Sequence, residues 1–147
     1  MADDRKDRVR IWFESLRDQL CAAFEALEDE APGDLYPGAP GQFVRTPWRR
    51  GGGGEGGGVA GLMRGRFFEK AGVHVSTVFG PLSPEFASQV KGADAADPRF
   101  WASGISLIAH LKNPHCPAAH MNTRHLQTTQ WWFGGGGDLN PDRKSVV

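Results

Sequence analysis

The sequence predicts an α+β fold in which helices flank an antiparallel β-sheet. Three observations support this prediction. A long amphipathic helix opens the chain, most later segments alternate apolar and polar residues as strands do, and a short helical segment interrupts those strands near residue 85. The order helix, strands, short helix, strands favours an antiparallel sheet flanked by helices, and 147 residues are enough for a single domain covering residues 1–147.

The first predicted helix runs from Asp3 to about Glu30. Its apolar residues recur every three or four positions, and charged residues fill most of the positions between them. Such a helix packs its apolar stripe against a sheet. The proline- and glycine-rich connector at residues 32–41 predicts no helix. The stripe consists of Val9, Phe13, Leu16, Leu20, Phe24 and Leu27.

Three candidate strands and a short helix follow the connector. Extended segments are expected at residues 43–45, 59–66 and 71–79. His74, in the third segment, is expected to be an exposed or hydrogen-bonded strand residue. Ser83 and Pro84 are typical of a helix start, with serine as the N-cap, and predict a helix that reaches about residue 90.

The glycine-rich run at residues 51–58 resembles a phosphate-binding loop only in composition. It lacks the GxxxxGK[ST] spacing and has no regular GxGxxG that leads into a helix, so nucleotide binding is disfavoured. A flexible or tightly turning loop is the better-supported interpretation. A lid over a ligand is a further interpretation, in which Arg45, Arg49 and Arg50 would meet anionic groups.

Residues 101–128 contain four of the five histidines and predict a β-hairpin. Alternating arms at residues 102–112 and 118–127 enclose a turn at 113–117, whose two prolines do not fit paired central strands. A further strand is expected at residues 130–133. The glycines and the Asp-Leu-Asn-Pro that follow it are expected to form a loop.

Strand parity divides the histidines of this hairpin into two groups. If the turn is centred on His115, His110 lies opposite His120 and Ser106 lies opposite Arg124. His115 then lies in the turn and His125 on the other face, so both are expected to be structural or surface residues. One face would carry Ser106, His110, His120, Asn122 and Arg124.

This polar face is compatible with three kinds of chemistry. His110 and His120 could ligate a divalent metal ion, although two ligands do not complete a site. A histidine with a pKa near neutrality could instead act as a general acid or base. Arg124 could bind a carboxylate through its bidentate fork, with Ser106 and Asn122 as further donors. The residues alone therefore predict a carboxylate-binding enzyme.

The overall composition excludes several classes of partner. Seventeen basic and seventeen acidic residues give a formal net charge of zero, which disfavours nucleic acid as a partner. No apolar run approaches the roughly 18 residues of a membrane span. The charged start, MADDRKDRVR, is unlike a signal peptide, and two cysteines predict no disulfide scaffold. These features together predict a cytoplasmic protein.

The hairpin segment GISLIAHLKNPHCPAAHMNTRH resembles the signature of the oxygen-dependent coproporphyrinogen-III oxidase family. Three other stretches resemble the same family in the same order: the glycine-rich run before Val59, FFEKAGVHVSTVFG at residues 67–80, and WWFGGGGDLNP at residues 131–141. The resemblance implies a large antiparallel sheet between layers of helices, in a homodimer. It also implies that His74 stands where asparagine is commoner and that Glu55 interrupts the glycine run.

The resemblance also implies an activity. Family members convert two propionates of coproporphyrinogen III to vinyl groups, which gives protoporphyrinogen IX for haem biosynthesis. They consume dioxygen, release carbon dioxide and hydrogen peroxide, and use no organic cofactor. A divalent metal cation is assigned in bacterial members.

The resemblance further implies roles for individual residues. His120 matches the proton donor, and His110 matches a metal ligand. Asp138 matches a residue that could contact pyrrole N–H groups. Ser106 and the run Asn122, Thr123 and Arg124 match substrate-contacting positions.

The resemblance covers an N-terminal portion of the family, about half its usual length. The tail at residues 142–147 is atypical of the family's continuation. The sequence therefore predicts a truncated chain whose own activity is in question. The alternative function is an inactive fragment that acts only as a tetrapyrrole- or metal-binding module.

Overall fold

The computed structural model describes residues 4–52, 54–94 and 96–141. These residues form one six-stranded antiparallel sheet in which every strand pairs with its neighbours in sequence order. The α+β prediction is therefore confirmed. The atypical tail at residues 142–147 lies outside the described residues. The elements are α1 (Asp4–Glu30), β1 (Val44–Arg49), β2 (Glu55–Met63), β3 (Phe68–Pro81), α2 (Pro84–Ala87), β4 (Arg99–Leu111), β5 (Ala118–Gln127) and β6 (Trp131–Asn140).

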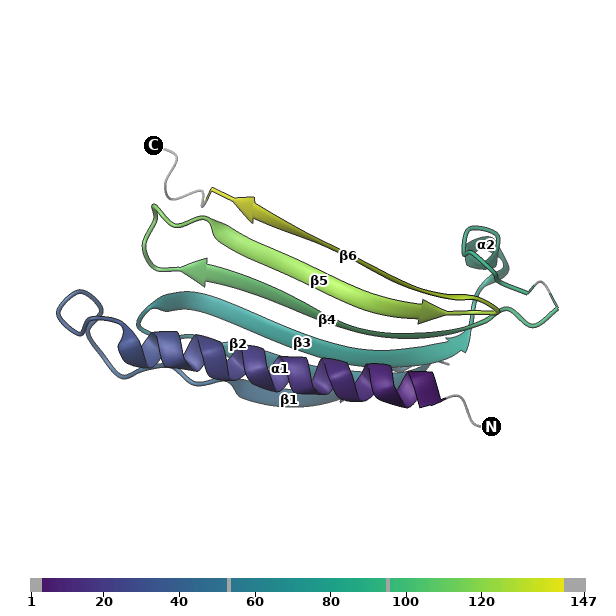
Figure 1. Cartoon of the computed structure of the whole chain (residues 1–147), viewed down its shortest axis with the longest axis horizontal. Helices are drawn as coiled ribbons and strands as arrows, with labels where there is room; N and C mark the ends of the chain where they lie inside the picture. The colour runs from purple at the N-terminus through teal and green to yellow at the C-terminus, as the bar shows by residue number, and fades with distance from the viewer. Residues whose placement is uncertain (1–3, 53, 95, 142–147) are drawn as a thin grey trace.

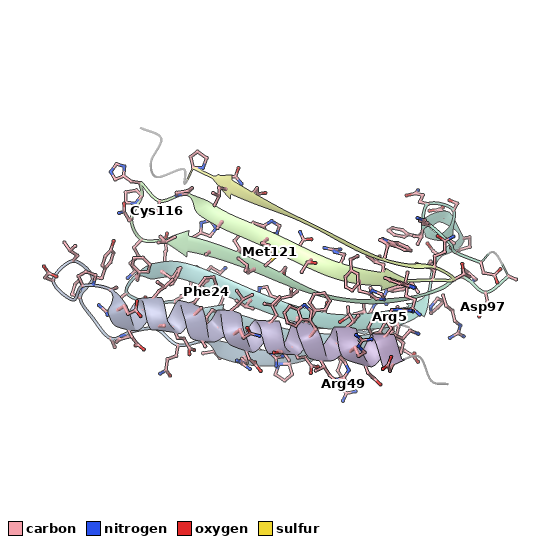
Figure 2. All side chains as sticks on the ribbon, viewed as in Figure 1. Arg5, Phe24, Arg49, Asp97, Cys116 and Met121 are labelled. Atoms are coloured by element: carbon pink, nitrogen blue, oxygen red, sulfur yellow. The ribbon has the colours of Figure 1, made fainter. Side chains whose placement is uncertain are left out.

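The long helix α1 lies along one face of the sheet, where it packs against β3 and β4, and α2 lies at one end of the sheet (Figure 1). Phe13 of α1 is 1% exposed, and the ring centroid of Phe24 lies 5.1 Å from that of Phe68 in a tilted contact. Figure 2 shows Phe24 near one end of α1 and Met121 on β5. Among the described residues, no helix is long and apolar enough to cross a membrane. The core beneath α1 contains Val9, Phe13, Cys21, Val73, Val75, Ile105 and Leu107.

A buried carboxylate fixes the C-terminal end of α1 to the sheet. Glu28 has no exposed surface, and its two carboxylate oxygens accept hydrogen bonds from four backbone N–H groups at 2.6–3.3 Å. Burial alone raises the pKa of Glu28, but these N–H groups hold it below its ordinary value. A Cβ at Gly65 would lie 1.5 Å from a Glu28 oxygen, so glycine is required there. The donors belong to Gly41, Arg66, Phe67 and Phe68.

Two glycine-rich segments that were expected to be loops are strands, so these predictions were wrong. Glycines 56–58 belong to β2, and glycines 134–137 belong to β6. Sheet pairing supplies their backbone hydrogen bonds, which outweighs the low strand propensity of glycine. A Cβ at Gly58 would lie 2.2 Å from the carbonyl oxygen of Val75, so the strands approach too closely there for a larger residue. The lid interpretation is not supported, because Arg45 and Arg49 belong to β1 and residues 55–58 belong to β2.

The short helix α2 begins as predicted and ends earlier than predicted. Ser83 accepts a hydrogen bond from the N–H of Phe86 as N-cap, and Pro84 is in the first turn. The helix ends at Ala87 rather than near residue 90. Side chains of the β5–β6 turn hold the following loop, since Thr129 donates to the carbonyl of Gly92 at 2.6 Å. Gly92 has a φ of +72°, which no continuing helix adopts.

Candidate functional site

The face of the sheet opposite α1 carries the polar residues singled out from the sequence. Ile105 and Leu107 point toward α1 and are buried, so Ser106 and His110 point to the open face. The β4–β5 pairing places Ser106 opposite Asn122 and Gly104 opposite Arg124. The predicted division of residues between the two faces is therefore confirmed.

The predicted pairing of individual residues across the hairpin was wrong by two positions. His120 lies opposite Ile108 rather than His110. The pairs are centred on Pro114, because Asn113 closes a turn in which its carbonyl oxygen accepts from the N–H of Cys116 at 3.1 Å. Its side-chain oxygen accepts from the N–H of His115 at 2.9 Å. A shift of two residues preserves parity, so every side chain keeps its face.

Arg124 borders a cavity of about 230 Å³ on the open face. A row of paired residues crosses the sheet from Trp48 through Gly58, Ser76 and Gly104 to Arg124. The sheet surface between the two large side chains of this row therefore consists of small residues. The Arg124 side chain is exposed and has no ion-pair or hydrogen-bond partner among the described residues. An unpaired guanidinium beside a cavity is suited to bind a carboxylate.

His74 and Ser106 lie side by side at this cavity, because they are paired residues of β3 and β4. Burial lowers the pKa of His74, and the positive charge of Lys70 lowers it further. The imidazole is therefore neutral at pH 7. Its Nε2 lies over Gly72, since a Cβ added at Gly72 would be 2.8 Å from that nitrogen.

A second cavity of about 320 Å³ on the same face is lined by His110, His120 and Asp138. His120 and Asp138 are paired residues of β5 and β6, with Nδ1 of the imidazole 4.0 Å from Oδ2 of the carboxylate. The other oxygen of Asp138 accepts from the amide of Asn140 at 3.0 Å. The carboxylate lies on the Nδ1 side of the ring, which leaves Nε2 available to another partner.

The described residues do not assemble a complete metal site. Within residues 4–52, 54–94 and 96–141, no three histidine, cysteine, aspartate or glutamate side chains gather closely enough to hold a metal ion. His110 lies in the second cavity with His120, but two imidazoles fall short of the ligand set that a divalent ion requires. The described residues therefore do not supply enough ligands for the proposed metal ion.

Three other residues of the hairpin were assigned from parity or from the resemblance. Thr123 is paired with Ile105, so its side chain points to the α1 side and its main chain lines the cavity of Arg124. His125 is fully buried, with its ring centroid 4.8 Å from Phe133 and 5.8 Å from Trp101. His115 is exposed in the turn. These positions confirm the expectation that His115 and His125 lie apart from the polar face.

Sequence reasoning missed two residues of the open face, Trp48 and His74. Trp48 lies on β1, four strands from Arg124, and only the pairing of β1 with β2 brings it to the cavity. His74 shares parity with Ser76 in its own strand. The connection between β3 and β4 is long, so the sequence did not indicate which residue of β4 lies opposite His74.

The fold and the site together define an α+β domain with an open sheet face suited to binding carboxylates. The chain belongs to the coproporphyrinogen III oxidase family, whose profile matches residues 8–145. It is 52% identical to the oxygen-dependent coproporphyrinogen-III oxidase of Rickettsia felis over 141 residues, and equally identical to that of Rickettsia akari. Each alignment covers 96% of this chain and 49% of the relative. The chain therefore spans about half the length of these curated relatives.

Proposed function

We propose that this chain serves in the oxidative decarboxylation of coproporphyrinogen III to protoporphyrinogen IX, with dioxygen as oxidant and no organic cofactor. In each step a propionate group and O₂ give a vinyl group, carbon dioxide and hydrogen peroxide. One observation carries the proposal. A family member presents an arginine that no other described residue pairs, and a histidine–carboxylate pair, in neighbouring cavities of one open sheet face. A cytoplasmic homodimer is part of the same proposal.

Arg124 binds a propionate carboxylate of the substrate in this proposal. Its guanidinium offers two parallel N–H donors and is not engaged by any described acidic residue. The Ser106 hydroxyl and the Asn122 amide lie directly opposite each other one row away, and they add donors for the same ligand. Thr123 contributes through its main chain.

His120 transfers the proton at the reacting pyrrole. Asp138 keeps a carboxylate oxygen near Nδ1 of His120, which orients the ring. Nε2 then faces the ligand. Asp138 is also half exposed, so it is free to accept a hydrogen bond from a pyrrole N–H.

Product formation tests this function directly. The chain is incubated anaerobically with coproporphyrinogen III, oxygen is then admitted, and the products are separated by chromatography. A second sample uses the chain extended to the length of the Rickettsia felis relative with that relative's remaining sequence. Protoporphyrinogen from the extended protein supports the proposal, whereas no product from either protein contradicts it. Binding without product by the 147-residue chain alone favours the alternative, a tetrapyrrole-binding module without turnover.

Single substitutions in the extended protein separate the roles of the two cavities. His120→Ala is expected to lower turnover by about 10²- to 10⁴-fold, the usual contribution of a general acid, with little loss of binding. Arg124→Ala is expected to weaken substrate binding instead. His115→Ala, in the exposed turn, is the control for a histidine far from both cavities. Equal, small effects of His120→Ala and Arg124→Ala contradict the proposed site.

His110 is proposed as one ligand of a divalent metal ion, and its other ligands would come from outside the described donor set. Elemental analysis of the purified wild type and of His110→Ala tests the assignment. Unchanged metal content in the variant removes His110 as a ligand.

A further inference from the structure

We propose that His74 is a further ligand-binding residue, whose imidazole N–H donates a hydrogen bond to the ligand that Arg124 anchors, at a point between Arg124 and His120. This inference rests on the proposed function, because it names a further contact for the same ligand. Three observations support it: the position of His74 at the cavity, the absence of a hydrogen-bond partner for its ring among the described residues, and the space that Gly72 leaves for it.

The sheet register brings His74 to the ligand side of the cavity. His74 is paired with Ser106, which is in turn paired with Asn122, so one row across β3, β4 and β5 carries three polar side chains. Arg124 lies in the adjacent row of the same open face. His74, Ser106 and Arg124 all line the one cavity. A ligand that Arg124 anchors there accordingly meets polar groups of the adjacent row.

The His74 imidazole is available to a ligand. Among the described residues, none forms a hydrogen bond with it, and the side chain is half-buried against the open face. Half-buried polar groups without a protein partner are satisfied by water or by a ligand. Because burial and Lys70 lower its pKa, the ring is neutral at pH 7 and carries one N–H donor. Lys70, Ser106 and Arg124 are the polar and charged groups that surround it.

Gly72 gives the His74 ring its position between the two cavities. A Cβ at Gly72 would lie 2.8 Å from Nε2 of His74 and 3.4 Å from a methyl carbon of Ile108. Ile108 is the paired residue of His120, so the ring leans from the cavity of Arg124 toward that of His120. His74 thereby contacts a ligand that extends from the carboxylate anchor toward the proton donor. Any side chain at Gly72 would displace the ring from this position.

Binding of coproporphyrin III, the stable oxidised porphyrin that keeps the propionates, tests the inference on the 147-residue chain. The change in porphyrin fluorescence gives Kd for the wild type, His74→Asn, Arg124→Ala and His115→Ala. His74→Asn removes one neutral hydrogen bond to the ligand, so it is expected to lower the affinity by about 3- to 10-fold. Arg124→Ala is expected to lose more, because a charged contact is lost. His115→Ala, in the exposed turn, is expected to bind as the wild type does.

A double substitution shows whether the effect passes through the imidazole. Gly72→Ala displaces the ring and is expected to lose affinity by a similar factor in the wild-type background. In the His74→Asn background, which lacks Nε2, Gly72→Ala is expected to have no further effect on Kd. His74→Gln, whose amide reaches the position of Nε2, is expected to recover part of the loss. Circular dichroism of each variant verifies that the sheet is intact.

The outcomes separate this inference from the proposed function. If the wild type binds coproporphyrin III and Arg124→Ala weakens binding, but both His74→Asn and His74→Gln bind as the wild type does, the inference is overturned and the proposed function stands. Independent, additive losses from Gly72→Ala and His74→Asn also overturn it. If the wild type does not bind, or Arg124→Ala has no effect, the proposed carboxylate site is wrong and His74 loses its role with it.

Discussion

The face of the sheet that α1 covers and the face that it leaves open are built from alternate residues of the same strands. On the covered face Val73, Ile105 and Leu107 are at most 9% exposed and pack against α1. On the open face the neighbouring side chains of Ser106 and Arg124 are half-buried or exposed and polar. One face therefore supplies the free energy of folding, and the other is left free to bind a ligand.

Glu28 and Arg124 are two ionisable groups that differ in burial and in hydrogen-bond partners. Glu28 at the end of α1 is buried and fully hydrogen-bonded by backbone N–H groups. Arg124 on the open face has no partner among the described residues. A buried charge without partners would be destabilising, whereas an exposed one costs nothing until a ligand arrives. Glu28 thus serves the structure, whereas Arg124 is left available to a ligand at the candidate site.

Removal of an aromatic side chain from the covered face is expected to lower the free energy of unfolding most. Phe13→Ala deletes a side chain that is 1% exposed beneath α1 and is expected to destabilise the chain by about 3–5 kcal/mol, because it leaves a cavity. Urea unfolding followed by circular dichroism measures this loss. The neighbouring residue Trp12 is 53% exposed, so Trp12→Ala is the matched control and should cost less than about 1 kcal/mol. Equal losses from the two variants would contradict the assignment of the covered face.

Substitution of the buried carboxylate should have the next largest effect. In Glu28→Gln an amide replaces one of the two oxygens, and at least one backbone N–H near Phe67 loses its acceptor. The expected loss is about 3 kcal/mol. Glu30→Gln, which alters an exposed glutamate two residues further along, is the control for the change of charge alone. A loss below about 0.5 kcal/mol for Glu28→Gln would show that the anchor is not needed.

The same carboxylate makes stability depend on pH. The pKa of Glu28 is lower in the folded chain than in the unfolded chain, whose ordinary value is 4.5. The unfolded state therefore binds a proton first as pH falls. The stabilisation is fully present above the unfolded value and is lost as pH falls through the folded pKa. Urea midpoints measured from pH 7 down to pH 3 should fall more steeply for the wild type than for Glu28→Gln.

The sequence predicted the division between the faces because parity depends only on alternation within a strand. Ile105 and Leu107 share one face of the sheet, and Ser106 and His110 share the other, whichever strand pairs with them. The direct partners were not predictable, because they depend on how Asn113 closes the turn. A glycine-centred strand such as Gly134–Gly137 has no alternation at all, so only its pairing with β5 reveals it.

Long-range pairing also determined which site residues could be found. Ser106, His120 and Arg124 lie on one hairpin, so local pattern was sufficient to group them. His74 and Trp48 reach the same cavity from β3 and β1, through pairings that separate segments of the chain make. Glu28 gave no signal because its partners are backbone N–H groups, which every sequence contains. A single sequence thus predicts local faces better than the sites that distant strands complete.

The smallest expected effect on the free energy of unfolding is at Arg124, on the open face. Without ligand, Arg124→Ala should change the free energy of unfolding by less than about 0.5 kcal/mol, because the exposed guanidinium has no described partner. Alanine also keeps the Cβ that packs against Gly104. With coproporphyrin III at 100 times its Kd, the wild type should gain about 2.7 kcal/mol by mass action, and the variant should gain much less at that concentration. A ligand-free loss above 1 kcal/mol would instead make Arg124 part of the structure, and the open face would no longer differ from the covered one in the way proposed.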